Sequence, residues 1–369
     1  MIRKISNQAM PYAWGSTTLI SEYLGYEETG TPMAEIWFGT HPASMAEDAA
    51  TGKPLLELRD GKPLSFLMKF LAADNALSIQ AHPNREQAKA AFAAGNKNYR
   101  DDQHKPETIV AISEFEALCG FKTDQQIREL FEDILSYPIT PELAHAVNHW
   151  LEIFAQGLQP LFSHLLHARG EFSEIGLSLA ALADFDSRFE LAAKLNSQHP
   201  GDPGVAVALL MNYVRLQPGQ ALALPAGNIH AYLSGLGVEV MAASDNVLRG
   251  GLTVKPIDVD ELERVVDFGD RGIHQVQIKK LAAGLEKFVT GFDDDFVLYR
   301  IEPSSERLHA DLEISADAIA VCIGGEVSVS NSLDEREVLY RGEAAIIGSD
   351  ARLVSFSGSG TIYLAVGNN

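Results

Sequence analysis

The 369 residues, 46% of them hydrophobic and 21% charged, have the composition of a globular protein and form too long a chain for one compact core. Lys and Arg number 29 and Asp and Glu number 50, and the resulting net charge of −21 excludes broad binding to nucleic acid or to an anionic membrane. An anionic ligand therefore needs a local basic pocket.

The cysteines and the N-terminus indicate the compartment. Cys119 and Cys322 lie far apart and form no CxxC pattern, so both are expected to be small core residues in a reducing environment. Residues 1–16 lack the apolar run of a signal peptide, and no segment reaches the ~20 apolar residues of a membrane span. A cytoplasmic protein with no membrane partner is expected.

Residues 1–122 are expected to form a β-rich unit. Short apolar segments, such as Leu64 to Ala72 and Thr108 to Ile112, are separated by Gly, Pro, Asn and Asp. The Ala-rich run from Arg85 to Ala94 is an exception. There the sequence predicts a helix with Asn84 as its N-cap.

One strand of this unit, residues 77–84, carries polar side chains on a single face. Side chains alternate along a strand, so one face is expected to be apolar and the other polar. The apolar face would carry Leu77, Ile79 and Ala81, and the polar face Ser78, Gln80 and His82. Taken alone, this pattern favours an ordinary half-solvated strand over a metal site.

Residues 123–215 are expected to be a helical insertion, because Thr123 to Gln126 resembles a capping box and apolar residues follow at helical spacing. Strand patterns return in residues 216–258, which complete the first unit as a discontinuous barrel. Residues 259–369 form a third unit of short alternating strands. Within it, the acidic run from Asp293 to Asp295 is expected to be a solvated loop.

The returning strands hold the second half of a possible metal site. The spacing G-x5-P-x-G-x2-H, at Gly219, Pro225, Gly227 and His230, resembles the second motif of the cupins, small metal-binding jelly-roll barrels. It leaves His230 at the start of a strand and aimed into the barrel mouth. Glu107 follows Pro106, which fits only an edge or a first strand position, so Glu107 also falls at a barrel rim.

The four candidate ligands offer two imidazoles, a carboxylate and an amide oxygen, from His82, His230, Glu107 and Gln80. A nitrogen and oxygen site with room for water suits Zn²⁺ in a catalytic role. The absence of Cys from this set is compatible with a reducing compartment.

Four segments, in this order, resemble those of the type I mannose-6-phosphate isomerases: LSIQAHPN at 77–84, HKPE at 104–107, LPAGNIHAYLSG at 224–235 and ASDNVLRGGLT at 243–253. The segments YAWG at 12–15 and EIWFGTHP at 35–42 also look like that family, and the resemblance spans residues 1–256. It implies a mainly β fold with an α-helical insertion, built from two cupin jelly-roll barrels and a helical domain. Residues 1–122 with 216–258 would be the catalytic barrel, 123–215 the insertion and 259–369 a C-terminal barrel.

The resemblance also implies one Zn²⁺ per chain, held by Gln80, His82, Glu107 and His230, and reversible isomerisation of mannose 6-phosphate and fructose 6-phosphate through an enediol. Gln103 departs from the family, where Asn is expected. The third unit departs further. The Pro, Gly and His positions of the motif become Gly348, Asp350 and Leu353, which predicts a degenerate barrel that does not bind the metal.

Proton transfer needs a group with a pKa near neutrality beside the metal. Lys105 shares strand parity with Glu107, so Lys105 and His104 are the preferred candidates for ring opening or proton transfer, with Glu239 as the rival base. Glu239 could equally be a barrel-lining hydrogen-bonding residue. Arg249 is a permanent cation, which the resemblance places in the active site to clamp the phosphate or to stabilise the enediolate.

Four further residues are candidates for substrate binding. By the resemblance, Asp245 and Lys255 line the pocket of Arg249, and Ser78 shares the face of Gln80. Lys69 interrupts an apolar strand, where a buried charge needs a partner. That partner is either a substrate phosphate or an internal carboxylate.

Two other functions are compatible with parts of the pattern. A metal-cupin oxygenase usually has a third His where this chain has Gln80. A non-catalytic sugar-phosphate-binding module would keep Lys69 and Arg249 but would need no base. In each case the expected ligand is a small molecule rather than a nucleic acid, and the expected state is a monomer or a weak homo-oligomer.

Overall fold

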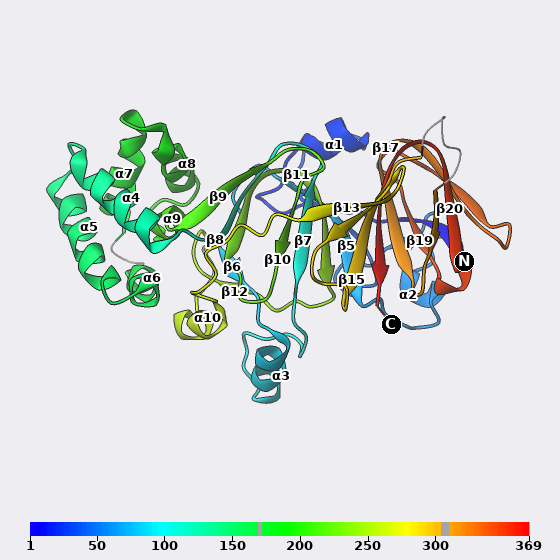
Figure 1. Cartoon of the computed structure of the whole chain (residues 1–369), viewed down its shortest axis with the longest axis horizontal. Helices are drawn as coiled ribbons and strands as arrows, with labels where there is room; N and C mark the ends of the chain where they lie inside the picture. The colour runs from blue at the N-terminus through cyan, green and yellow to red at the C-terminus, as the bar shows by residue number, and fades with distance from the viewer. Residues whose placement is uncertain (169–171, 304–309, 369) are drawn as a thin grey trace.

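The computed structural model describes residues 1–168, 172–303 and 310–368, and no helix in these ranges is long and apolar enough to cross a membrane. Three parts lie in a row along the longest axis, with a group of helices at one end, a β-sheet in the middle and a second β-sheet at the other end (Figure 1). The expected mainly β fold with a helical insertion is confirmed. The domain boundaries and the cupin character of the barrels stay predictions.

The middle sheet is organised around the long strand β11 (His230–Ala242). Its first part pairs with β6 (Gln80–Ala81) and β8 (Phe115–Phe121), and its second part with β5 (Phe66–Ala73) and β7 (Glu107–Ala111). The sheet has 10 strands, of which the others are β2 (Ala9–Met10), β3 (Glu35–Phe38), β9 (Met211–Leu216), β10 (Ala221–Leu224) and β12 (Leu248–Arg249). One strand thus brings segments from distant parts of the sequence together.

The insertion comprises α4 (Asp124–Ser136), α5 (Pro141–Phe154), α6 (Leu158–His167), α7 (Ser173–Ala181), α8 (Glu190–Gln198) and α9 (Gly204–Leu209), with 3-10 turns at Leu182–Asp184 and Ser187–Phe189. Its apolar core includes Ile79 and Ala81 from the sheet. The predicted caps are confirmed: Thr123 begins α4 with a capping box, and Asn84 does the same for α3 (Arg85–Ala93). The helices are therefore packed directly behind the strand that carries Gln80.

The alternation expected along residues 77–84 is only partly correct. Ile79 and Ala81 pack into the core of the insertion, but Leu77 packs against a separate core inside the middle sheet. The reason is that the regular strand is limited to Gln80–Ala81. Before this strand, the Leu77 amide donates to the Tyr232 carbonyl and the Ile79 amide donates to the Gly251 carbonyl. The segment therefore changes its hydrogen-bonding partner and does not form one continuous strand.

The second sheet contains the N-terminal strand. β1 (Ile2–Ser6) pairs with β19 (Ala344–Ile347) and with β4 (Glu47–Asp48), so the first strand of the chain is hydrogen-bonded into the sheet of the C-terminal strands. Ile2 and Ile5, three residues apart, lie on opposite faces of β1 and pack into two separate apolar cores. The other strands are β13 (Gln277–Ala282), β14 (Leu285–Val289), β15 (Phe296–Ile301), β16 (Ala310–Glu313), β17 (Ala318–Asn331), β18 (Arg336–Tyr340) and β20 (Leu353–Gly367).

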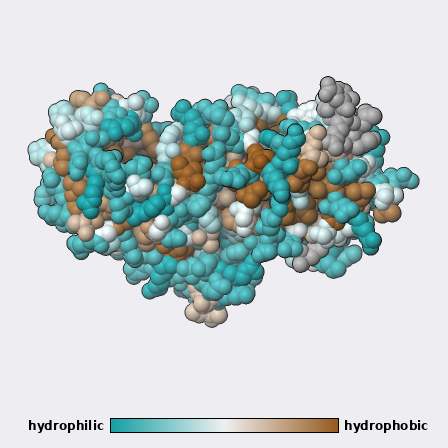
Figure 2. Space-filling model, viewed as in Figure 1, coloured by the Kyte–Doolittle hydropathy of each residue, from teal (hydrophilic) through white to brown (hydrophobic). Residues whose placement is uncertain are grey.

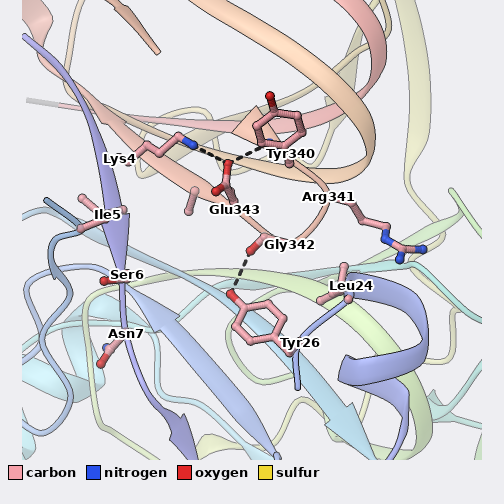
Figure 3. A pocket seen from close by; sticks show the side chains of 13 residues that line it. Lys4, Ile5, Ser6, Asn7, Leu24, Tyr26, Tyr340, Arg341, Gly342 and Glu343 are labelled. Carbon is pink, nitrogen blue, oxygen red and sulfur yellow. Dashed lines mark hydrogen bonds and ion pairs between the residues drawn. The ribbon is translucent and has the colours of Figure 1, made fainter. Parts of the chain in front are cut away.

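The junction between β1 and the turn before β19 is seen from close by in Figure 3. Lys4 Nζ lies 2.6 Å from Glu343 Oε2, and the Tyr26 hydroxyl donates to the Gly342 carbonyl at 2.8 Å. Burial raises the pKa of Tyr26 to about 12, so the phenol keeps its proton and stays a donor. Next to this junction, side chains of both sheets, Phe70 among them, pack into one apolar core. This shared core holds the two sheets together.

The remaining helices are short: α1 (Leu19–Leu24), α2 (Leu55–Leu58) and α10 (Val259–Val265), with a 3-10 turn at Ser349–Ala351. Cys119 and Cys322 are buried and free, as expected. Figure 2 shows a face covered largely by hydrophilic side chains, with hydrophobic ones visible between them over the sheets.

Ile5→Ala tests the placement of β1. Ile5 is 4% exposed, and its truncation is expected to lower the free energy of unfolding by about 2–5 kcal/mol. Ile278→Ala makes the same chemical change on β13 of the same sheet, where Ile278 is 37% exposed, and is expected to cost about 0.5 kcal/mol. Urea denaturation followed by fluorescence measures both, and equal losses would contradict the placement.

Candidate metal centre and adjoining cavity

Three side chains converge at the start of β11. His82, Glu107 and His230 are buried and each offers a ligand atom, and these atoms lie within 4.8 Å of one another. Both imidazole Nε2 atoms lie 3.4 Å from a Glu107 carboxylate oxygen. In the protein alone, the two Nε2 atoms and Glu107 Oε2 have no hydrogen-bond partner. Unpaired polar atoms at this depth are rare, and together they indicate a ligand.

The outer nitrogen of each imidazole fixes the ring. His82 Nδ1 lies 2.7 Å from the Asn246 carbonyl, and His230 Nδ1 lies 3.1 Å from the Asn228 carbonyl. A carbonyl only accepts, so each Nδ1 carries the proton and each Nε2 presents a lone pair to the centre. Burial lowers the pKa of His82 to about 4, which keeps that ring neutral and ready to bind a cation.

Lys105 supplies the positive charge nearest the cluster. Its Nζ lies 2.8 Å from Glu107 Oε1, so the two residues reach the same site, as their strand parity predicted. Burial disfavours the charged carboxylate, but the Lys105 ammonium holds the pKa of Glu107 well below its usual range. Glu107 is therefore an anion when it faces the two rings.

Lys69 lies in an ion-pair cluster next to this centre. Its Nζ is 3.0 Å from Glu239 Oε2, 3.4 Å from Glu35 Oε1 and 4.9 Å from the centre of the Trp37 ring. Burial alone would lower the pKa of Lys69, but the two carboxylates raise it. Burial raises the pKa of Glu239, and Lys69 opposes that shift. Of the two partners expected for Lys69, the structure provides the internal carboxylate, so its burial requires no substrate phosphate.

A cavity of about 560 Å³ adjoins the cluster and is lined by four predicted site residues, Ser78, Gln80, Arg249 and Lys255. Gln80 connects the two features, because it is the cross-strand neighbour of both His230 and Arg249. Arg249 is half-buried and has no ion-pair partner among the described residues. In a chain with a net charge of −21, such a cation favours an anionic ligand in this cavity.

His104 and Asp245 lie outside the lining of that cavity. His104 Nε2 is 2.7 Å from Asp295 Oδ1, and the Arg85 guanidinium contacts both of these atoms. Asp295, expected in a solvated loop, is in fact only 14% exposed and joins the third unit to the HKPE segment. Asp245 Oδ2 lies 3.0 Å from His41 Nε2, and this hydrogen bond lowers the pKa of Asp245, with smaller contributions from Lys105 and Lys69.

The donor set fits a divalent metal. Two neutral imidazole nitrogens and a carboxylate are the ligands of catalytic zinc sites, and their second nitrogens are oriented by carbonyls as in such sites. Gln80, whose side chain carries an amide oxygen, is the cross-strand neighbour of His230. Among the described residues, this is the one group of three or more His, Cys, Asp or Glu with ligand atoms gathered in this way.

Several residues around the site were not proposed as site residues from the sequence. Trp14, Gln198 and His199 line the cavity from segments far apart in the chain. Trp14 and Glu35 lie within the family-like segments at 12–15 and 35–42, and that resemblance is the signal that could have identified them. Asn246 holds His82 through its backbone carbonyl, a role that does not depend on the side chain.

Comparisons with known proteins agree with this geometry. Residues 2–124 match the family model described as phosphomannose isomerase type I, catalytic domain. A mannose-6-phosphate isomerase from Salmonella typhimurium is 34% identical, with 98% of both chains covered, and one from Schizosaccharomyces pombe is 37% identical over 68% of this chain and 70% of its own. A crystal structure of a mutant Salmonella phosphomannose isomerase aligns over 100% of both chains with a TM-score of 0.90 and 32% identity. A zinc-bound mannose 6-phosphate isomerase does so with a TM-score of 0.88 and 32% identity.

Metal analysis tests the cluster. The purified protein is expected to bind one Zn²⁺ per chain, and His230→Ala is expected to weaken binding by more than about 100-fold, because even outer partners of metal ligands contribute 10–100-fold. His164→Ala makes the same change on α6, outside the cluster. Zinc is measured by elemental analysis after dialysis against a weak chelator, and normal zinc content in His230→Ala would exclude it as a ligand.

Proposed function

Because the chain belongs to the type I phosphomannose isomerase family, we propose that it interconverts mannose 6-phosphate and fructose 6-phosphate at the His82, Glu107 and His230 cluster. The observation that carries this assignment is the set of three buried ligand atoms without partners beside a cavity that presents Arg249. The reaction needs a place for a cation, a proton carrier and a binding site for phosphate.

We assign the zinc ligands to His82 Nε2, His230 Nε2, the Glu107 carboxylate and the Gln80 amide. The first three residues offer ligand atoms within 4.8 Å of one another, and Gln80 lies opposite His230 in the sheet. Bound zinc supplies a Lewis acid that polarises the substrate oxygens and stabilises developing negative charge. The protein contributes the tautomers of the rings and the low pKa of Glu107, both of which favour cation binding.

We propose that the cavity holds the sugar phosphate. Its volume of about 560 Å³ is in the usual range for a small-molecule site. Arg249, which has no carboxylate partner in the described residues, offers a fixed cation, while Ser78 and Lys255 offer hydrogen-bond donors on the same wall. These three residues would hold the phosphate or the anionic transition state.

For proton transfer we propose Lys105 as the first candidate. Its Nζ lies 2.8 Å from Glu107 Oε1 and the side chain is 10% exposed, so it is close to the proposed zinc ligands and largely shielded from bulk water. Glu239 remains the rival base, because burial raises its pKa towards the useful range. His104 is retained for ring opening, with Asp295 orienting its imidazole.

The remaining candidates have supporting roles in this proposal. Lys69 forms ion pairs with Glu35 and Glu239 beside the ligands and does not need to contact substrate. Asp245 is paired with His41 near the same cations. The two buried free cysteines support a cytoplasmic enzyme, and we infer a monomer or a weak homo-oligomer that binds a small sugar phosphate.

The first test is direct conversion. Zinc-loaded protein incubated with mannose 6-phosphate is expected to form fructose 6-phosphate. A coupled assay or NMR measures the appearance of this product. Tight binding without turnover would instead favour a sugar-phosphate-binding module. Oxygen consumption with Fe(II) would favour the oxygenase alternative, and either result would contradict the assignment.

Two variants separate metal binding from proton transfer. Gln80→Ala is expected to lose zinc and rate together, because it removes a proposed ligand. Lys105→Ala is expected to keep zinc and to lose rate by about 100-fold or more, the contribution typical of a positioned proton carrier. Rate and zinc content are measured on the same samples. Full activity of Lys105→Ala would transfer the role to Glu239, which Glu239→Gln then tests.

A further inference from the structure

Asp202 reaches from the helical insertion into the backbone of the active-site loop, residues 249–255. It lies between α8 and α9 and is 7% exposed. Its Oδ1 accepts from the amides of Gly204 at 2.8 Å and Leu252 at 3.0 Å, and its Oδ2 accepts from the amide of Thr253 at 3.2 Å. Hydrogen bonds to a buried carboxylate are stronger than neutral ones, so this contact is a firm attachment between the two segments.

The loop needs such support because its own conformation is unfavourable. Gly251 has φ +125° and Leu252 has φ 52°, and the latter is uncommon for a residue with a side chain. On the opposite side the loop is bound to the ligand-bearing strand, since Gly250 donates to Ile79 at 2.7 Å and Ile79 donates to Gly251 at 3.0 Å. The loop is thus held between the strand of Gln80 and Asp202.

Gly204 brings the two segments into direct contact. A Cβ atom at Gly204 would lie 2.5 Å from the amide nitrogen of Leu252 and 2.9 Å from the Cα of Gly251, so only glycine permits this approach. The insertion also forms part of the cavity wall through Gln198 and His199. The Gln198 side chain accepts from the amide of Ala76 at 3.1 Å, which attaches a second point of the insertion to the barrel.

We propose that Asp202 is a positioning residue for the isomerase: it fixes the backbone of the active-site loop so that Arg249 and Lys255 face the sugar phosphate. This proposal rests on the proposed function and deepens it. It gives the helical insertion a role in substrate binding, since the carboxylate that holds the loop comes from the insertion and not from the barrel. Asp202 itself does not line the cavity, so it acts only through the loop.

Three variants and a matched control test the role. Asp202→Ala removes the hydrogen bonds from Gly204, Leu252 and Thr253, whereas Asp202→Asn keeps those to Oδ1 and places an amide group against the Thr253 N–H. Gly204→Ala displaces the loop without changing charge. Asp186→Ala is the control, because Asp186 accepts from the Arg188 amide at 2.8 Å in the same insertion and contacts no residue of the loop.

The expected result is a split between KM and kcat. In Asp202→Ala the KM for mannose 6-phosphate should rise by about tenfold or more, since misplaced binding groups cost this much, and kcat should fall less. Asp202→Asn should give a smaller rise, and Gly204→Ala should raise KM in the same way. Zinc content should stay at the wild-type level in all three, because none of the proposed ligands belongs to the loop. Asp186→Ala should leave KM unchanged.

Wild-type KM in folded Asp202→Ala, or an equal rise in Asp186→Ala, would overturn the proposal. Zinc loss in parallel with the KM effect would also overturn it, since the role would then be general support of the barrel. If Asp202→Ala does not fold, Asp202→Asn and Gly204→Ala decide the question, and wild-type KM in both would contradict it. Failure of the proposed function is distinct, because the wild-type protein itself would then not convert mannose 6-phosphate.

Discussion

The arrangement of the site depends on three buried polar atoms that the protein does not satisfy. His82 Nε2, His230 Nε2 and Glu107 Oε2 face one another without hydrogen bonds, and leaving a buried polar group unpaired costs about 1–3 kcal/mol each. Backbone carbonyls prevent the rings from turning away, and Lys105 keeps the carboxylate charged. A bound cation satisfies all three atoms at once, so this otherwise unfavourable arrangement is consistent with a metal centre.

The rest of the molecule holds these atoms in place. β11 begins with His230 and pairs along its length with the strands that carry Gln80, Glu107 and Lys69. The helical insertion packs behind β6 and, through Asp202, attaches to the loop of Arg249. Each functional side chain is thus supported from a regular element or a bound loop, which is the rigidity that a catalytic site requires.

Local sequence predicted the features that depend on local chemistry. The caps at Asn84 and Thr123, the mainly β fold and the helical insertion follow from short patterns. Motif spacing selected His82, Glu107 and His230, which gather at the cluster, whereas Arg249 and Lys255 at the cavity came from the family resemblance. Local sequence did not predict the contacts between segments that are far apart in the chain. The five residues of β1 do not specify the sheet that the strand joins, and the partners of Lys69 come from two other strands, β3 and β11. The acidic run that contains Asp295 was predicted to be solvent-exposed. That prediction failed for Asp295 because its contact with His104 depends on the tertiary fold.

Anomalous diffraction from a crystal of the zinc-loaded protein, recorded on both sides of the zinc absorption edge, tests the central claim most directly. The account predicts one strong anomalous peak per chain, between His82, Glu107 and His230 and within reach of the Gln80 side chain. A protein that contains stoichiometric zinc but shows its peak elsewhere, with these three side chains unligated, would contradict it.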